Sequence, residues 1–250
     1  MGVDAGLTSQ GPDAVAIGTG SGQTTQGTNS VAVGVYAGQA TQGASSVDVG
    51  HNSGVNDQKD NAVGVGLGAG VLSQGVGSVA IGAYSGYLNQ KDTSIAIGRS
   101  AAFSGQKVGA VALGLEAGKN TQGTNSVAIG TYTGQTSQQD SCVAVGSGAG
   151  RTSQKSRAVA LGLKSGSASQ GIASIAIGAY SGYTNLGDYS VALGFGAGLN
   201  DQPDNTTVIN ATGTSYSPVT PGAFYVAPIR QAGATFQLFY NPVTKEISYN

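Results

Sequence analysis

The sequence predicts an all-β fold, a β-solenoid of 16-residue coils that ends in a small C-terminal β cap. The pentapeptide Ala-Val-Ala-Ile-Gly at 14–18 recurs every 16 residues, in twelve copies without an insertion. Glycine supplies 43 of the 250 residues and falls at fixed places in this repeat. After Asn205 the composition changes, since the last 45 residues hold three glycines but seven of the sixteen aromatic residues. A disordered chain has no reason to keep such a register, so the glycine content indicates a repeat architecture.

The repeat divides the chain into two parts. Residues 1–205 form the repeat array, in which 1–13 are a partial first coil and twelve coils of 16 residues follow. Gly2, Ala5, Gly6 and Gln10 fall in register with repeat positions five, eight, nine and thirteen, so we expect the chain to start within a longer array. Residues 206–250 are the predicted capping and trimerisation segment.

Each coil is numbered here from the first residue of its pentapeptide. Positions two and four are always Val, Ile or Leu, and position three is Ala in ten of twelve copies. This alternation predicts a short strand, because successive side chains of a strand face opposite ways. We expect the branched residues to face the inside of the coil and the uniform alanine face to lie against other chains. This would make the protein an obligate oligomer.

Glycine and glutamine mark the other fixed positions. Glycine at positions five and nine predicts bends or close backbone contacts. We expect a second strand at positions six to nine and then a turn centred on position thirteen, where stacked Gln amides would form a ladder along one edge. In the first six coils, position five is Gly18, Gly34, Gly50, Gly66, Gly82 and Gly98, and the first four position-thirteen glutamines are Gln26, Gln42, Gln58 and Gln74.

The C-terminal segment is predicted to cap the solenoid. Residues 206–210 continue the array as a half coil, and 223–229, 234–240 and 246–249 have strand patterns separated by proline and glycine turns. A solenoid needs its last coil covered against edge-to-edge growth. The expected core of this cap consists of Phe224, Tyr225, Phe236, Phe239 and Tyr240.

Composition excludes several classes of function. Eleven basic and twelve acidic residues give a net charge of −1, which provides no electrostatic footprint for nucleic acid or an anionic membrane surface. We expect no nucleic acid partner and no insertion of this segment into a membrane. The single His51 and single Cys142 provide no catalytic set and no metal cluster, so we expect a non-enzyme without cofactors. Cys142 is expected to be a packed small thiol, and the Gly-x-Gly patterns belong to the repeat rather than to a phosphate loop.

Asp48 is the unusual residue of the third coil, because it replaces the position-three alanine. If the alanine face surrounded a three-fold axis, three Asp48 carboxylates would converge there and need a cation, protons or water. Asp48 is therefore a candidate for an axial ion site. The alternatives are a water-filled polar layer or a carboxylate that faces solvent.

Two segments resemble known families. Asn-Ser-Val-Ala-Val-Gly at 29–34 and Asn-Ser-Val-Ala-Ile-Gly at 125–130 resemble the head repeats of YadA-like trimeric autotransporter adhesins. The resemblance covers about residues 1–210 and implies a left-handed parallel β-roll, a homotrimer and attachment to host surface molecules. The strict 16-residue unit with its Gln departs from bacterial heads, whose units vary. Residues 222–230 and 238–247 resemble the segment of viral and phage fibre proteins that precedes an intramolecular chaperone.

These observations predict a fibre or adhesin head, with a viral fibre favoured. A homotrimeric rod on a virion or cell surface, or outside the cell, would present repeated side chains to a host glycan or protein. The candidate receptor-facing residues are Tyr36, Tyr84, Tyr87, Tyr132, Tyr180 and Tyr183. One alternative is a purely structural spacer or self-assembling filament. Another is an ice-binding solenoid, which needs a regular threonine array that positions eleven and twelve do not supply.

Overall fold

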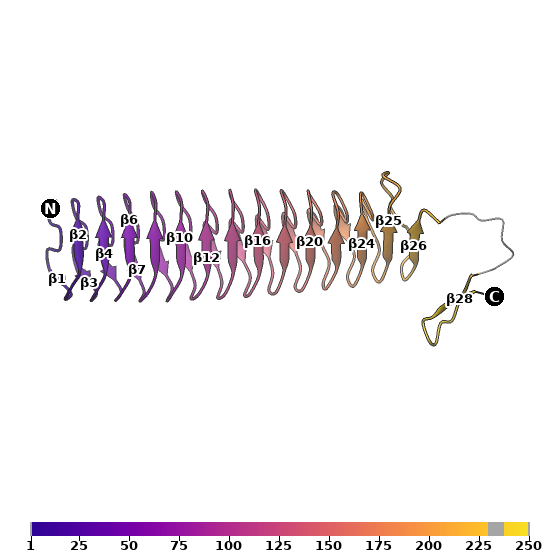
Figure 1. Ribbon diagram of the computed structural model, residues 1–250, viewed down its shortest axis with the longest axis horizontal. Helices are drawn as coiled ribbons and strands as arrows, with labels where there is room; N and C mark the ends of the chain where they lie inside the picture. Colours follow the sequence, from indigo (N-terminus) through magenta and orange to yellow (C-terminus); the bar gives the residue numbers. More distant parts are fainter. Residues whose placement is uncertain (1, 230–237, 250) are drawn as a thin grey trace.

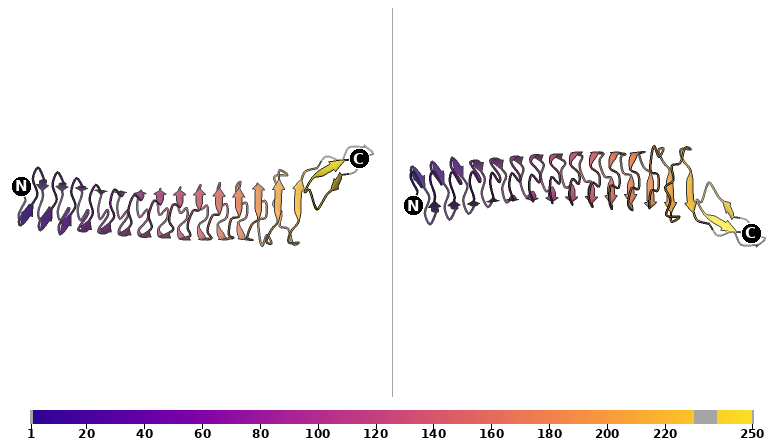
Figure 2. Two further views of the ribbon diagram at one scale, coloured as in Figure 1. Left: turned by 90° about the horizontal axis from the view of Figure 1, so that it is seen from below. Right: turned by 90° about the horizontal axis from the view of Figure 1, so that it is seen from above.

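Each 16-residue repeat folds into one coil with two short strands, and the coils stack along a single axis into a rod (Figure 1). The computed structural model describes residues 2–229 and 238–249. Strand one of a coil spans positions two to four, and strand two ends at position thirteen. Two parallel sheets result, and they run along opposite sides of the rod (Figure 2).

The larger sheet has fourteen strands, which at about 4.8 Å per strand gives a length of roughly 60 Å. Its strands in spatial order are β2 (Val15–Ile17), β4 (Val31–Val33), β6 (Val47–Val49), β8 (Val63–Val65), β10 (Val79–Ile81), β12 (Ile95–Ile97), β14 (Val111–Leu113), β16 (Val127–Ile129), β18 (Val143–Val145), β20 (Val159–Leu161), β22 (Ile175–Ile177), β24 (Val191–Gly194), β25 (Thr207–Asn210) and β26 (Phe224–Ala227).

The second sheet has twelve strands. They are β1 (Ser9–Gln10), β3 (Thr25–Gln26), β5 (Thr41–Gln42), β7 (Asn56–Gln58), β9 (Leu72–Gln74), β11 (Leu88–Gln90), β13 (Ser104–Gln106), β15 (Asn120–Gln122), β17 (Thr136–Gln138), β19 (Thr152–Gln154), β21 (Ala168–Gln170) and β23 (Thr184–Leu186). Within residues 2–229 and 238–249 no helix is long and apolar enough to cross a membrane.

The register confirms the predicted solenoid. Strand partners are equivalent residues of successive coils, so that Ala80 pairs with Ala96 and Ile81 with Ile97 in parallel strands. Backbone hydrogen bonds continue the same pattern outside the strands, for example from Gly98 N to Ile81 O at 2.8 Å. Identical positions therefore form columns along the rod, and a feature of the repeat becomes a feature of a whole face.

The lumen is lined by small side chains, which corrects the predicted orientation of strand one. The alanines at position three are completely buried inside their coils, for example Ala80, Ala96 and Ala112, except for the half-buried Ala16 of the first full coil. The Val, Ile and Leu residues at positions two and four point outward, and Ile97 is 38% exposed. The physical reason is lumen width, since a coil of two three-residue strands leaves room only for methyl groups, hydroxyls and one crossing amide.

The second strand also differs from its prediction. Positions six to nine form a turn, because the residues at positions seven and nine adopt positive φ, as Tyr36 (φ 57°) and Gly38 (φ 54°) do. Such left-handed residues cannot continue a strand. Strand two instead leads up to position thirteen, so the glutamine ends a strand rather than centring a turn.

Each position-thirteen glutamine reaches across the lumen to the opposite sheet. Gln90 is buried, and its Nε2 donates to Val79 O at 2.8 Å and to Ser94 O at 3.2 Å. Both amide hydrogens thus satisfy carbonyls of the opposite wall. The predicted amide ladder exists in part, with Gln106 Nε2 donating to Gln122 Oε1 at 3.0 Å, but it lies inside the lumen and not along an edge.

Close stacking explains the glycine at position five. Gly98 has φ +125°, and a Cβ added there would lie 2.5 Å from Gly114 O of the next coil. Neither the conformation nor the space admits a side chain. The invariance of Gly18, Gly34, Gly50, Gly66 and Gly82 has the same cause, since each has a φ between 120° and 134° and stacks on the next glycine.

The C-terminal segment extends the large sheet. β25 confirms the predicted half coil, and β26 adds one more parallel strand. β27 (Leu238–Tyr240) and β28 (Ile247–Tyr249) form a separate antiparallel pair, in agreement with the strand prediction for this region. The capping role itself stays a prediction.

The prediction that aromatic side chains pack into a core of the cap is wrong for a single chain. Tyr225 packs against the cluster that contains Val208, but Phe224, Phe239 and Tyr240 are 54%, 48% and 60% exposed. Phe236 lies outside the described residues. Phe224 is exposed because it points outward from β26, the last strand of the large sheet, and Phe239 and Tyr240 belong to the separate two-stranded pair β27–β28.

Candidate interaction surfaces

The outward side of the large sheet is a continuous apolar surface, called here the apolar face. It consists of the position-two and position-four residues of the even-numbered strands β2 to β24. These residues are Val, Ile or Leu without exception and are half-buried or exposed. Ile209 of β25 pairs with Val226 of β26 and so continues the position-four column, whereas Thr207 interrupts the position-two column before Phe224. A solvated sheet face normally carries polar residues, so a contiguous apolar one is a candidate interaction surface.

The opposite side, called here the polar face, is formed by positions eleven and twelve of the small sheet. Thr136 and Ser137 of β17 are both exposed and polar, and so are Asn120 and Thr121 of β15. Leu72 and Ala168 interrupt the column at position eleven, so threonines do not form the regular array that ice binding requires.

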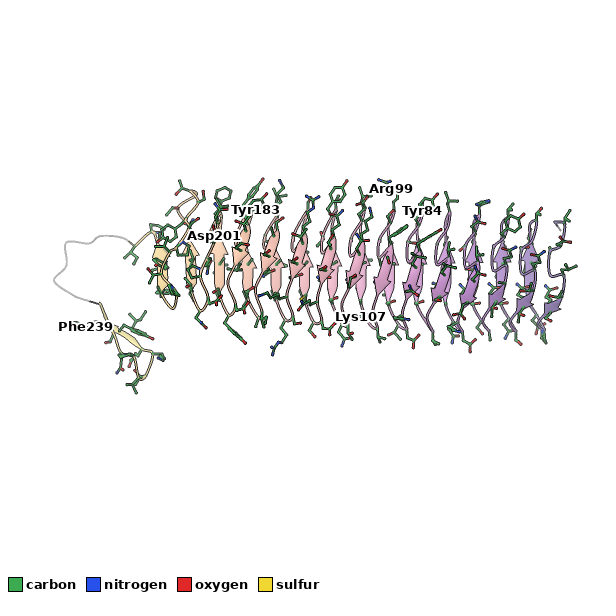
Figure 3. All side chains as sticks on the ribbon, turned by 180° about the vertical axis from the view of Figure 1, so that it is seen from behind. Tyr84, Arg99, Lys107, Tyr183, Asp201 and Phe239 are labelled. Carbon is green, nitrogen blue, oxygen red and sulfur yellow. The ribbon has the colours of Figure 1, made fainter. Side chains whose placement is uncertain are left out.

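One of the two turn edges carries the tyrosines, and it is called here the tyrosine edge. Tyr36, Tyr84, Tyr132 and Tyr180 occupy position seven of every third coil, which spaces them by roughly 14 Å along the rod. The first three are exposed by about the same fraction (39%, 41% and 38%), and Tyr180 is half-buried. Figure 3 shows Tyr84 and Tyr183 on this edge and Lys107 on the opposite one.

Aromatic side chains gather into two clusters on the tyrosine edge. In the first, Tyr87 stacks on Phe103 with ring centroids 5.0 Å apart, and Tyr84 meets Tyr87 edge-on at 5.9 Å. In the second, Tyr180 contacts Tyr183 at 5.8 Å and Phe195 at 6.2 Å. The pairs Tyr84–Tyr87 and Tyr180–Tyr183 are 96 residues apart, which is six coils.

The two phenylalanines are functional candidates that the sequence analysis missed. Phe103 lies at position ten and Phe195 at position six, so neither belongs to the tyrosine column. Only the fold of the turn brings positions six, seven and ten of neighbouring coils into contact. A signal existed, since Tyr87 also occupies position ten, one coil before Phe103.

Charged groups on the tyrosine edge contact the rings and one another. The Arg151 guanidinium lies 5.8 Å from the Tyr132 ring centroid, and Lys164 Nζ lies 5.7 Å from that of Tyr180. These are cation–π distances. Arg151 Nε also donates to Gln135 Oε1 at 3.0 Å.

The hydrogen bonds that begin at Arg151 and Gln135 continue to the carboxylate of Glu116. Gln135 Nε2 donates to Glu116 Oε2 at 2.7 Å, and Lys119 Nζ lies 3.2 Å from that oxygen. Partial desolvation raises the pKa of Glu116, but the bonds from Lys119 and Gln135 outweigh it, so the net shift is downward. Glu116 is therefore ionised and paired, and it holds these side chains in place.

The other turn edge carries aspartates with a structural role. At position fifteen, Asp60 Oδ1 accepts from Ala44 N at 2.8 Å and Asp140 Oδ1 from Thr124 N at 2.7 Å. Asp188 likewise accepts from Ile172 N, and this backbone hydrogen bond is the main cause that lowers its pKa. Each carboxylate thus satisfies a backbone N–H of the preceding coil.

Asp48 lies in the lumen, which corrects the axial-ion hypothesis. It is completely buried, and it accepts from Gln58 Nε2 at 2.8 Å, Gln42 Nε2 at 3.1 Å and Ser53 Oγ at 3.3 Å. Burial raises its pKa to about 8, and these hydrogen bonds offset the shift only in part. Because position three faces the lumen of each coil, three Asp48 carboxyls cannot converge on an axis between chains.

The neighbouring coil is adapted to Asp48. Gly64 replaces alanine at position three of the next coil, and a Cβ added there would lie 2.5 Å from Asp48 Oδ1. Asp48 and Gly64 are thus related exceptions to alanine at position three. The absence of a side chain at Gly64 leaves room for the larger side chain of Asp48.

The remaining single residues form no site. His51 is exposed at position six, and Cys142 is buried, with its Sγ 2.9 Å from Lys155 O. Burial raises the pKa of the Cys142 thiol, which agrees with a packed side chain. Across residues 2–229 and 238–249, no three His, Cys, Asp or Glu side chains gather in a way that could hold a metal ion.

Comparison with known proteins supports the head-repeat resemblance. The family model of the YadA head domain repeat matches two segments, residues 9–37 and 120–133. No curated protein and no solved structure matches the chain, and the resemblance of the tail to viral fibres has no further support. Two segments of the chain are thus similar to the YadA head repeat, and the stacked parallel coils agree with this similarity.

Proposed function

We propose that this protein is the rod-shaped head of a homotrimeric surface adhesin or fibre. Its role is structural and non-catalytic, and it attaches to a receptor on another surface. The observation that carries the proposal is the apolar face, which runs without interruption along strands β2 to β24.

The lumen of one chain buries little apolar volume. Its completely buried residues are mostly alanine, serine and glutamine, whereas the Val, Ile and Leu side chains at positions two and four of the twelve coils are outside. Burial of apolar area is the main favourable term in folding, at about 25 cal/mol per Å². Association through the apolar face supplies the burial that the lumen cannot, so oligomerisation and stability are coupled.

The similarity to the YadA head family supports an assembly of three chains rather than two. YadA heads are typically homotrimers, and this chain matches their repeat in two segments. Three apolar faces turned toward one axis would leave the three polar faces outward. The same family supports a place at the cell surface or outside the cell, and the resemblance of the tail favours a viral fibre on a virion.

Sedimentation equilibrium of the full chain tests the assembly. We expect a discrete trimer that does not grow with concentration. Ile129→Lys, on the apolar face, should dissociate it, because a lysine would be desolvated at the interface. Thr136→Lys is the matched control, since it adds the same charge to an exposed position of the polar face. A wild-type monomer, or equal effects of both variants, would contradict the proposal.

Attachment needs a separate measurement. The fluorescently labelled trimer should bind host-type cells saturably, and unlabelled trimer should compete. An intact trimer that binds no cell would assign the protein to the second class, a structural spacer. Open-ended growth with concentration would instead indicate a self-assembling filament.

A further inference from the structure

We propose that the tyrosine edge between Tyr84 and Phe195 binds an anionic polysaccharide that lies along the rod. This segment is called here the aromatic–basic tract. The proposal rests on the proposed attachment function and names the ligand class that this function would use.

The tract combines ring faces with positive charge. From Tyr84 to Phe195 the basic residues of this edge are Arg99, Lys119, Arg151 and Lys164, and its one acidic residue is Glu116. Most aspartates of the chain lie at repeat positions twelve, fifteen and sixteen, toward the opposite edge. The acidic residues of the rod therefore lie mostly toward the opposite edge, which also carries five basic residues (Lys59, Lys91, Lys107, Lys155 and Arg157). The tract differs from that edge in having four basic residues against one acidic residue, although the chain as a whole is nearly neutral.

Aromatic and basic groups alternate along the tract. The cluster of Tyr84, Tyr87 and Phe103 occupies the fifth and sixth coils, and the cluster around Tyr180 occupies the eleventh and twelfth. Tyr132, with Arg151 above its ring, lies between them. The tract spans seven coil steps, or roughly 34 Å, so it suits an extended polymer better than a small molecule.

Its side chains are already held in place. The chain of contacts from Arg151 through Gln135 to Glu116 and Lys119 runs across three successive coils. Groups that are ordered before binding lose less conformational entropy on binding. Lys164 is likewise positioned over the Tyr180 ring.

A sugar polymer fits this chemistry better than a nucleic acid does. Pyranose rings offer flat C–H faces to aromatic rings and hydroxyls to their polar rims, and carboxylate or sulfate groups pair with Lys and Arg. Single-stranded nucleic acid requires a continuous basic groove with free ring faces. Here the cations are few, and Tyr87 and Phe103 cover one face of each other at 5.0 Å.

The tract is placed to stay open in an oligomer built on the apolar face. Tyr87 and Tyr183 directly precede β11 and β23, which are strands of the polar face. In Figure 3 the labelled Tyr84, Arg99 and Tyr183 lie along one edge of the rod.

Direct binding of defined probes to the assembled full chain tests the proposal. The probes are a heparin decasaccharide, which carries sulfates, a hyaluronan decasaccharide, which carries carboxylates alone, and neutral dextran of similar size. Polyglutamate and a single-stranded oligonucleotide represent the other anionic polymers. We expect an acidic glycan to bind, with an affinity that falls as salt screens the charges, and dextran not to bind. Binding of one acidic glycan alone assigns sulfate or carboxylate as the recognised group.

Two matched pairs of variants locate the site. Tyr132→Asn should weaken binding about tenfold, equal to about 1.4 kcal/mol, while Tyr36→Asn should change it less than about twofold. Both tyrosines are similarly exposed with positive φ, and Asn52 occupies the same repeat position, but among the residues that the structure describes a cation lies over the ring of Tyr132 and none over that of Tyr36. Arg151→Gln should weaken binding, and Lys107→Gln, the same charge change on the opposite edge, should not. Sedimentation checks that each variant remains assembled.

Several results would overturn the proposal. They are equal binding of dextran, tighter binding of polyglutamate or the oligonucleotide, equal effects within either pair of variants, or no binding of any glycan. If the trimer still attaches to cells in those cases, the attachment function stands and only the ligand class is wrong. If attachment is also absent, the proposed function fails as well.

Discussion

Asp48 places a carboxyl in a lumen otherwise lined by methyl groups, hydroxyls and amides. Its pKa is about 8 in the folded protein, against an ordinary value of 3.8. Below pH 4 both states are protonated, and between about pH 4 and 8 only the unfolded state ionises. The stability of this region should therefore fall as pH rises, by at most about 1.4 kcal/mol per pH unit, and level off above pH 8.

Local hydrogen exchange over coils two to four at pH 5 and pH 9 measures this effect. In the wild type, hydrogen exchange at pH 9 should be faster than the intrinsic pH dependence of amide exchange predicts. Asp48→Ala, which restores the residue found in most coils, should remove the difference. Coils eight to ten serve as the internal control, and an equal change there would contradict the assignment to Asp48.

Gln90 shows what one residue contributes across the lumen. Gln90→Ala removes the donor to Val79 O and Ser94 O and leaves a void, so it should cost about 1–3 kcal/mol. Gln90→Leu should cost less, because Leu186 fills the equivalent position of another coil while 2% exposed. Thermal unfolding of both variants in parallel measures the difference. A leucine variant as unstable as the alanine variant would show that the hydrogen bonds outweigh the packing.

The turn between the two strands of a coil depends on glycines of two kinds. Gly114 at position five has φ +125°, and an added Cβ would lie 2.6 Å from Gly130 O. Gly118 at position nine has φ +54°, and an added Cβ would meet the side chain of Gln122, which can shift. Ala102 occupies the position of Gly118 in the preceding coil and is accommodated.

Gly114→Ala should therefore destabilise the rod by more than Gly118→Ala. A strained backbone position costs about 1–3 kcal/mol, and in Gly114→Ala the clash with backbone adds to it. Thermal unfolding and hydrogen exchange over coils six to nine compare the two variants. Equal destabilisation would mean that conformation alone, and not stacking distance, selects glycine at position five.

The whole rod is a sum of equivalent coils, each in contact with its neighbours only. Deletion of residues 110–125, one full coil, should shorten the rod by one step and leave its assembly intact, because every column stays in register. Deletion of 110–124 leaves one residue too many in the merged coil and should disrupt assembly, since a one-residue slip exchanges the two faces of a strand. Circular dichroism and sedimentation distinguish the outcomes. Loss of assembly in both variants would show that length itself, and not register, is required.

The architecture follows from sequence for a simple reason. A strict period forces equivalent residues into columns, so the 16-residue repeat determined the parallel solenoid, the columns of Gly and Gln, and the extra half coil at β25. The tyrosine column followed in the same way from the recurrence of Tyr36, Tyr84, Tyr132 and Tyr180.

Which side of each strand faces inward was decided only by the tertiary structure. The alternation of side chains defines two faces of each strand but does not determine which of them faces the lumen. The general rule that large apolar residues lie inside predicted the wrong face. The narrow lumen admits only Ala80 and its equivalents, together with the Gln90 amide, so the branched residues lie outside. This one choice places Asp48 inside a coil and turns the Val, Ile and Leu columns outward. The fold of the turns, which the period does not specify, brings Phe103 and Phe195 to the tyrosines.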